Sequence, residues 1–271
     1  MECDAEKWRG RWTAAGPEGG RGGGEIGLLG RVAGLHRWGM DESWVLDEMA
    51  HAGAEHLDEA FIAGYDRKQG HPDPGAHIAE LEARGLGATS VVVDLGAGTG
   101  QFALQAARRF GRVIAVDVSP AMVAALRAKA EAEGIANLTA ERAGFLSFDP
   151  GGPVDGVFTR HALHQLPDFW KAVALQRIAD MLRPGGVLLL RDLIYDFSPA
   201  EAGDVFAGWL AGAATDPARG YTAGDYAEHI RTEYSTFRWL LEPMLAAAGF
   251  EVADVHYERR LYGAYTCVKS G

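Results

Sequence analysis

A glycine-rich turn that follows an acidic side chain is the part of this chain best suited to bind a ligand. The segment VVVDLGAGTG ends an apolar run at Asp94 and Leu95 and then places Gly96, Gly98 and Gly100 in alternation with small residues. Adjacent β-branched residues are typical of a strand covered on both faces, and glycines let the backbone approach a ligand closely. The pattern predicts a nucleotide-like cofactor at this turn.

The spacing of the glycines discriminates between cofactors. A dinucleotide fingerprint, G-x-G-x-x-G, would have its third glycine at position 101, where this chain carries Gln101. The Asp94 carboxylate would repel a pyrophosphate, whereas it can orient an ammonium group directly or through water. S-adenosylmethionine, which carries an ammonium group and a sulfonium, therefore fits the turn better than a nicotinamide dinucleotide.

A second acid follows at the distance expected for a ribose contact. The segment RVIAVDVSP predicts a strand that ends at Asp117. In doubly wound folds, an acid about 20 residues after the first glycine binds the ribose hydroxyls. Ser119 and Pro120 predict the N-cap and the first residue of the helix that comes next.

Six motifs occur in an order that is typical of one protein family. They are DLGAGTG, AVDVSPAMV, ERAGFLSF, VDGVFTRHALHQLPD, LRPGGVLLLRD and AAAGFEV. Over residues 59–269 the chain resembles the class I S-adenosylmethionine-dependent methyltransferases, and is most similar to small bacterial members that act on small molecules. The resemblance implies transfer of a methyl group to a small-molecule acceptor, with S-adenosylhomocysteine as the product.

The resemblance also implies which residues contact the cofactor. Tyr65 resembles the family tyrosine that closes over the methionine part, although a helix-end aromatic would look the same. Gly144 stands where the family carries an acid that binds the adenine amino group. The next residue, Phe145, can pack on the adenine ring and donate its backbone N–H, or it can be a core residue without such a role. The expected contacts are Tyr65, Asp94, Gly96, Ala97, Gly98, Gly100, Asp117, Val118, Met122, Gly144, Phe145, Thr159 and Arg160.

Histidines follow the fourth predicted strand, at the carboxyl edge where open α/β sheets bind their ligands. His161 and His164 are the first choices for a proton acceptor, with Glu233 and Tyr234 in reserve. A helix-packing role is the main alternative for His164. Methyl transfer from a sulfonium needs mainly alignment and exclusion of water, so few dedicated groups are required. We expect His229 to be remote from the site.

Several function classes are disfavoured. Thr159, Arg160, His161 and Ala162 stand where methyltransferases of nucleic-acid bases carry an Asn/Asp-Pro-Pro-aromatic tetrapeptide, and a net charge of -11 leaves no basic face for a phosphate backbone. Thr159 also cannot provide the first acid of a magnesium-chelating site, and Asp192 alone would be a weak one. We expect neither a nucleic-acid partner nor a metal. Two alternatives stay open: an enzyme that uses S-adenosylmethionine in a non-methylating reaction, and a non-catalytic binding protein.

The expected fold is an α/β, Rossmann-like, doubly wound sheet of seven mostly parallel strands with helices on both faces. Strands are predicted near 90–95, 112–117, 137–142, 154–159 and 185–191, with a final hairpin over 250–269. The predicted organisation is a flexible glycine-rich segment (1–30) and one methyltransferase domain (31–271). That domain comprises N-terminal helices (31–88), a cofactor-binding core (89–196), a helical cap (197–248) and the C-terminal hairpin (249–271).

Composition bears on the compartment and the partners. No apolar stretch reaches the length of a membrane span, and the two cysteines, Cys3 and Cys267, lie far apart without metal-like spacing. We therefore expect a cytoplasmic protein with a small-molecule acceptor and no membrane partner. The acceptor atom, the acceptor itself and the oligomeric state stay open, with a homodimer among the alternatives.

Overall fold

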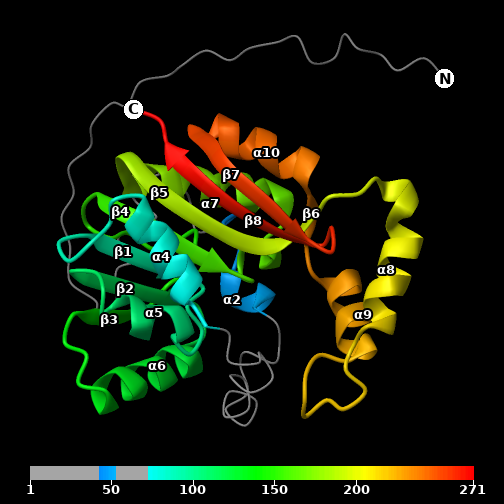
Figure 1. Cartoon of the computed structure of the whole chain (residues 1–271), viewed down its shortest axis with the longest axis horizontal. Helices are drawn as coiled ribbons and strands as arrows, with labels where there is room; N and C mark the ends of the chain where they lie inside the picture. Colours follow the sequence, from blue (N-terminus) through cyan, green and yellow to red (C-terminus); the bar gives the residue numbers. More distant parts are fainter. Residues whose placement is uncertain (1–42, 53–72) are drawn as a thin grey trace. The chain divides into compact units, whose positions relative to one another are not determined.

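The computed structural model describes residues 43–52 and 73–271, and the statements below concern those residues. Tyr65 and the glycine-rich segment predicted over residues 1–30 lie outside them. The described part of the chain is built on one central sheet with helices around it (Figure 1).

The sheet is mostly parallel, as the alternation of predicted strands and helices indicates. Its strands are β1 (Val91–Leu95), β2 (Arg112–Asp117), β3 (Leu138–Arg142), β4 (Val154–Arg160), β5 (Leu182–Tyr195), β7 (Phe250–Glu258) and β8 (Tyr262–Lys269). They lie in the order β3-β2-β1-β4-β5-β8-β7, in which β8 runs antiparallel to both neighbours. A short strand, β6 (Thr236–Phe237), pairs with the end of β5. The order confirms the predicted fold class and adds β6 to it.

Helices cover both faces of this sheet (Figure 1). The described helices are α2 (Glu48–His51), α4 (Gly75–Ala83), α5 (Gln101–Ala106), α6 (Pro120–Ala132), α7 (Asp168–Met181), α8 (Ala202–Ala211), α9 (Ala223–Thr232) and α10 (Arg238–Ala247). Side chains of α4, α5 and α6 pack on one face, and those of α7 and α10 pack on the other. The helix α6 begins as the sequence predicts, because Ser119 accepts a hydrogen bond of 3.2 Å from the N–H of Met122 and Pro120 is the first helical residue. Within residues 43–52 and 73–271, no helix has the length and apolar character that a bilayer crossing requires.

Alternate residues of the central strands enter two separate hydrophobic clusters. In β1, Val92 packs with side chains of α4, α5 and α6, whereas Val93 packs with side chains of α7 and α10. Leu189 and Leu188 of β5 divide in the same way. Because neighbouring residues of a strand face opposite ways, a sheet covered on both faces requires continuous apolar runs. The apolar runs that identify these strands in the sequence therefore consist of the residues that form the two hydrophobic clusters.

The helices α8 and α9 stand beside the sheet rather than on either face (Figure 1). Their apolar side chains form a third cluster with the end of β5, in which Tyr195, Phe197 and Trp209 are buried. Trp209 stacks on Tyr226 with ring centroids 4.3 Å apart. The aromatic residues of this segment thus pack largely on one another. The predicted assignment of 197–248 as a cap stays a prediction.

A buried ion pair fixes α4 to the centre of the sheet. Arg191 of β5 donates to Glu80 over 2.5 Å and to the carbonyl of Tyr265 over 2.5 Å, and its side chain is only 10% exposed. The other Glu80 oxygen accepts a hydrogen bond from the hydroxyl of Thr266. A surface pair on the same helix, Glu82 with Arg109, is far more exposed on its basic side.

We expect Glu80→Ala to lower the free energy of unfolding by about 2 kcal/mol, because it leaves the buried guanidinium without its carboxylate while the partial exposure of Glu80 moderates the loss. Urea denaturation measures the change. The matched variant is Glu82→Ala, for which the expected loss is below about 1 kcal/mol. Equal losses for the two variants would contradict a special role of the buried pair.

Candidate active site

The glycine turn between β1 and α5 forms the floor of the site. Gly96, Gly98 and Gly100 all have positive φ angles, of 75°, 53° and 88°. A side chain at Gly96 would collide with the Cβ atom of Ala162, which follows β4. The N–H groups of Gly96 and Ala97 donate to the carbonyl of Val116 over 2.9 Å and hold the turn against β2. Glycine is required here by backbone conformation and by close packing.

Asp117, at the end of β2, organises the same turn. Its Oδ2 atom accepts a hydrogen bond of 2.8 Å from the N–H of Gly98, and its Oδ1 atom accepts one of 2.8 Å from the N–H of Ser119. The carboxylate thus joins the glycine turn to the start of α6. The sequence prediction that Asp117 meets the ribose hydroxyls stays a prediction, and its position beside Gly98 is compatible with it.

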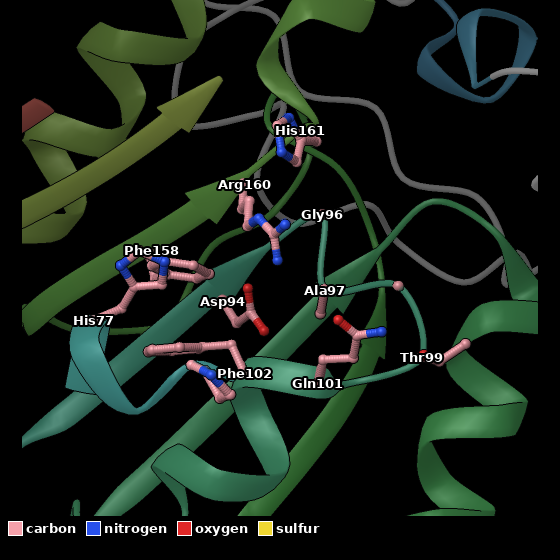
Figure 2. Close-up of a pocket in the computed structure, with 12 residues that line it drawn as sticks. His77, Asp94, Gly96, Ala97, Thr99, Gln101, Phe102, Phe158, Arg160 and His161 are labelled. Atoms are coloured by element: carbon pink, nitrogen blue, oxygen red, sulfur yellow. The ribbon is translucent and has the colours of Figure 1, made fainter. Parts of the chain in front are cut away.

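Asp94 is a buried carboxyl at the end of β1, with a side chain that points into a cavity (Figure 2). Burial raises the pKa of Asp94 to about 8, and the negative charge of Asp117 adds to that rise. A carboxyl in this state gains from a cation, because the nearby positive charge would restore its ionised form. Such an arrangement suits a ligand with an ammonium group.

Two cavities meet at the carboxyl edge of the sheet, and Gly96, Gly98 and His161 line both of them. The first is shown in Figure 2 and is a hollow of about 540 Å³, a volume that includes solvent-filled space at its open mouth. The second, of about 630 Å³, is open in the same way. Open α/β sheets bind their ligands at this edge. The first cavity is also lined by His77, Asp94, Thr99, Gln101, Phe102, Phe158 and Arg160, and the second by Glu48, Asp117, Val118, Gly144, Phe145, Ala162 and Gln165.

His161 lies where the two cavities meet, and its backbone conformation is strained. Its φ angle is 50°, which is unusual for a residue other than glycine and is found most often at functional sites. Its N–H donates to the carbonyl of Arg191 over 2.9 Å. The Nδ1 atom is buried and has no hydrogen-bond partner among the described residues. Burial, helped by the charge of Arg160, lowers the pKa of His161 to about 3, so its ring is neutral at physiological pH.

His164 lies behind this junction in a charged cluster. Its Nδ1 atom is 2.5 Å from Asp192 Oδ1 and its Nε2 atom is 2.9 Å from Glu233 Oε2. Burial lowers the pKa of His164, but the two carboxylates outweigh this and leave it raised, while the imidazolium keeps the pKa of Asp192 low. His164 is therefore a charged ring in this structure and not a free base.

The prediction that His229 is remote from the site is wrong. Its Nδ1 atom pairs with Glu233, and its ring centroid lies 5.1 Å from that of His164. The helix α9 returns His229 and Glu233 to β4 and β5, a long-range contact that local sequence patterns do not reveal. The donor atoms of His164, His229 and Glu233 lie within 4.8 Å of one another, so the three form a group with the residue types of a metal site.

The remaining predicted residues divide between the cavities and their surroundings. Ala97, Val118, Gly144, Phe145 and Arg160 line a cavity. Thr159 and Met122 are buried close to the same edge, and the Thr159 hydroxyl has no hydrogen-bond partner among the described residues. Tyr234 is 39% exposed, and its N–H donates to the carbonyl of His164. Glu48, His77 and Gln165 also line a cavity but were not predicted. Gln165 belongs to the fourth of the six motifs, whereas Glu48 and His77 lie outside all of them.

Comparison with known proteins supplies the family. Residues 92–186 match a family described as "Methyltransferase domain". A methyltransferase of Anoxybacillus flavithermus is 30% identical over 164 residues, which cover 60% of this chain and 70% of that protein. The chain belongs to the class I S-adenosylmethionine-dependent methyltransferases. Acetylserotonin O-methyltransferase of Mus musculus is 31% identical over 196 residues, which cover 70% of this chain and 47% of that enzyme.

Solved structures agree with this methyltransferase fold. Magnesium protoporphyrin IX methyltransferase of Synechocystis, crystallised with S-adenosylhomocysteine, aligns with a TM-score of 0.58 at 18% identity and covers 83% of this chain and 100% of that one. The alignments with the first curated relatives cover only 36% and 47% of their lengths. Members of the family use S-adenosylmethionine, and the residues at this edge fit that cofactor. The buried Asp94 carboxyl, whose pKa is raised, suits an ammonium group, and the Asp117 carboxylate beside the glycine turn is an acceptor of the kind that ribose hydroxyls need.

We expect Asp94→Asn to stabilise the ligand-free methyltransferase and to weaken its binding of the cofactor. The folded-state pKa of Asp94 lies above its usual value of 3.8, so its contribution to stability is present at pH 4 and is lost as the pH rises through about 8. The variant should therefore gain about 1 to 3 kcal/mol relative to the natural chain between pH 5 and pH 8.5. Denaturant unfolding at both pH values measures it.

Asp254→Asn, a change at an exposed position of β7, is the control and should show no such pH-dependent gain. A gain that is the same at both pH values would show that Asp94 is not the titrating group.

Proposed function

We propose that this chain transfers the methyl group of S-adenosylmethionine to a small-molecule acceptor. The observation that carries the proposal is the junction at His161, where the cavity beside Asp94 meets the cavity beside Asp117. A ligand with an ammonium group at one end and a nucleoside at the other would span both cavities and place its sulfonium near the junction.

The chain's own residues would hold the cofactor in three places. Asp94 would pair with the ammonium group, Asp117 would accept hydrogen bonds from the ribose hydroxyls, and Phe145 would pack on the adenine ring. The glycine turn would let the backbone approach the ligand closely. When bound, S-adenosylmethionine supplies a methyl group on a good leaving group, so the protein needs mainly to align the acceptor.

His161 is the catalytic residue in this proposal. Its ring is neutral and its buried Nδ1 atom lacks a hydrogen-bond partner among the described residues, so it can accept a hydrogen bond from the nucleophile of the acceptor. His164 is less suited to that task, because Asp192 and Glu233 already occupy its two ring nitrogens. We assign His164 a positioning role, in which its charged cluster fixes the segment after β4.

The acceptor class rests on composition and on the cavities. The net charge of -11 opposes binding to a nucleic acid, and the mixed apolar and polar lining of the cavities suits a small, partly apolar molecule. Relatives include an enzyme named for O-methylation of acetylserotonin, and the proposal extends small-molecule methylation to this chain. Action in the cytoplasm and closure of the acceptor pocket by residues 197–241 and the N-terminal helices belong to the same proposal.

Calorimetry with pure ligands tests the cofactor. We expect S-adenosylmethionine and S-adenosylhomocysteine to bind with micromolar dissociation constants and NAD to bind much more weakly, because Gln101 replaces the third glycine of a dinucleotide turn. Asp117→Ala should weaken S-adenosylhomocysteine about ten- to a hundredfold. Tighter binding of NAD would refute the assignment, and unchanged affinity in the Asp117 variant would refute its ribose contact.

Turnover with an acceptor found by screening tests the role of His161. We expect His161→Ala to lower kcat about a hundredfold while the cofactor dissociation constant stays within about twofold, because the ring acts on the acceptor. Detection of the methylated product also separates methyl transfer from a non-methylating reaction and from simple binding.

His256→Ala, at an exposed position of β7, is the matched histidine control and should keep full activity. If His164→Ala abolishes turnover while His161→Ala does not, the proton acceptor is His164 and our assignment is wrong. If only Glu233→Gln or Tyr234→Phe abolishes turnover, the proton acceptor is a residue of the segment after α9.

A further inference from the structure

The turn after β3 lacks the acidic side chain that the family uses for adenine, and another element brings one there. Gly144 is part of this turn and lines the second cavity. A Cβ atom added to Gly144 would collide with the carboxylate of Glu48, both of whose oxygens lie against this position. Glu48 belongs to α2, which precedes the whole sheet in the sequence. The space of a side chain at Gly144 is therefore already filled by a carboxylate.

Backbone hydrogen bonds hold that carboxylate in place. Glu48 Oε1 accepts a hydrogen bond of 2.9 Å from the N–H of Leu146, and the backbone of Phe145 also bonds to this side chain. Arg177 of α7 also holds the turn, because it donates to the carbonyls of Phe145 and Phe148 over 3.1 and 3.0 Å. Side chains of α2 and α7 thus fix the turn, which defines where its cavity-facing groups lie.

The state of Glu48 indicates that its carboxyl has capacity for another donor. Burial raises the pKa of Glu48 to about 7, although the N–H groups of Leu146 and Phe145 and the charge of Arg177 oppose that rise. The side chain also lines the same cavity as Asp117, Val118 and Phe145. A ligand N–H group placed in this cavity would add a hydrogen bond to a carboxylate that burial has left poorly solvated.

We propose that Glu48 accepts a hydrogen bond from the exocyclic amino group of the cofactor's adenine, in place of the acid that Gly144 lacks. The inference rests on the proposed use of S-adenosylmethionine. It makes α2 part of the cofactor site, and it explains why position 144 is glycine: an acid there would compete with Glu48 for the same space. Adenine selectivity in this chain then depends on an element outside the sheet.

The test compares two ligands that differ only at this amino group. They are S-adenosylhomocysteine and its 6-deamino analogue, in which a hydrogen atom replaces the amino group and the ring nitrogens are unchanged. We expect the natural chain to prefer S-adenosylhomocysteine by about tenfold or more, because the analogue has no N–H at this position to donate to Glu48. Glu48→Gln should remove that preference, since its amide oxygen still accepts from Leu146 while its NH2 group cannot accept from the adenine amino group.

Three further variants sharpen the comparison. Asp117→Ala should weaken both ligands by a similar factor, because their ribose groups are identical. Glu228→Gln, at a side chain that is 63% exposed, should change neither affinity. The double variant Glu48→Ala/Gly144→Asp should recover the preference for S-adenosylhomocysteine that Glu48→Ala loses, because it moves the carboxylate to the turn itself. This variant also keeps the test decisive if Glu48→Gln fails to fold.

The outcomes separate this inference from the proposed function. If the natural chain binds neither ligand, the proposed function fails and the role of Glu48 fails with it. If the natural chain binds S-adenosylhomocysteine and the Glu48 variants keep its full preference for that ligand, the proposed function stands and this inference is overturned.

Discussion

The burial of carboxyl groups at one edge of the sheet is the constraint on which the site depends. Asp94 and Glu48 line the two cavities, and burial raises the pKa of each. Asp192 and Glu233 are also shielded from solvent, yet contacts with His164 keep their pKa values low. Opposite charge therefore compensates the acids behind the site, whereas the acids that face the cavities have capacity for a ligand to compensate them. The acids whose desolvation is not fully offset by a neighbouring positive charge are therefore the ones that face the cavities.

That edge is rigid because the sheet carries two independent cores. Alternate residues of β1, β2 and β4 pack on opposite sides, so the strand ends that present Asp94, Asp117 and Arg160 are fixed from both faces. The segment with α8 and α9 packs instead on a third cluster that includes Leu193 and Tyr195 of β5. It is therefore anchored to the end of that strand rather than to either face of the sheet.

Local patterns were sufficient to predict the sheet and the glycine turn. The apolar runs identify the strands because both faces are buried, and Ser119 with Pro120 marks the start of α6 by capping chemistry that involves neighbours in sequence. The contact of Glu48 with Gly144 and the return of His229 to His164 were not predictable in this way. Each joins residues far apart in the chain, and nothing in the local sequence encodes the distance between them. The aromatic residues near α8 do not decide between packing and ligand binding, because both favour the same side chains, so their assignment to a cap stays a prediction.

The position of β8 has a consequence for how the chain folds. This strand lies between β5 and β7, although its residues follow all the others of the sheet in the sequence. Until residues 262–269 leave the ribosome, β5 has an unpaired edge that carries Leu188 and Leu190. An apolar strand with a free edge is a template for unwanted pairing, and contacts of long sequence separation form slowly. Insertion of β8 therefore closes the apolar edge that the parallel part of the sheet leaves at β5.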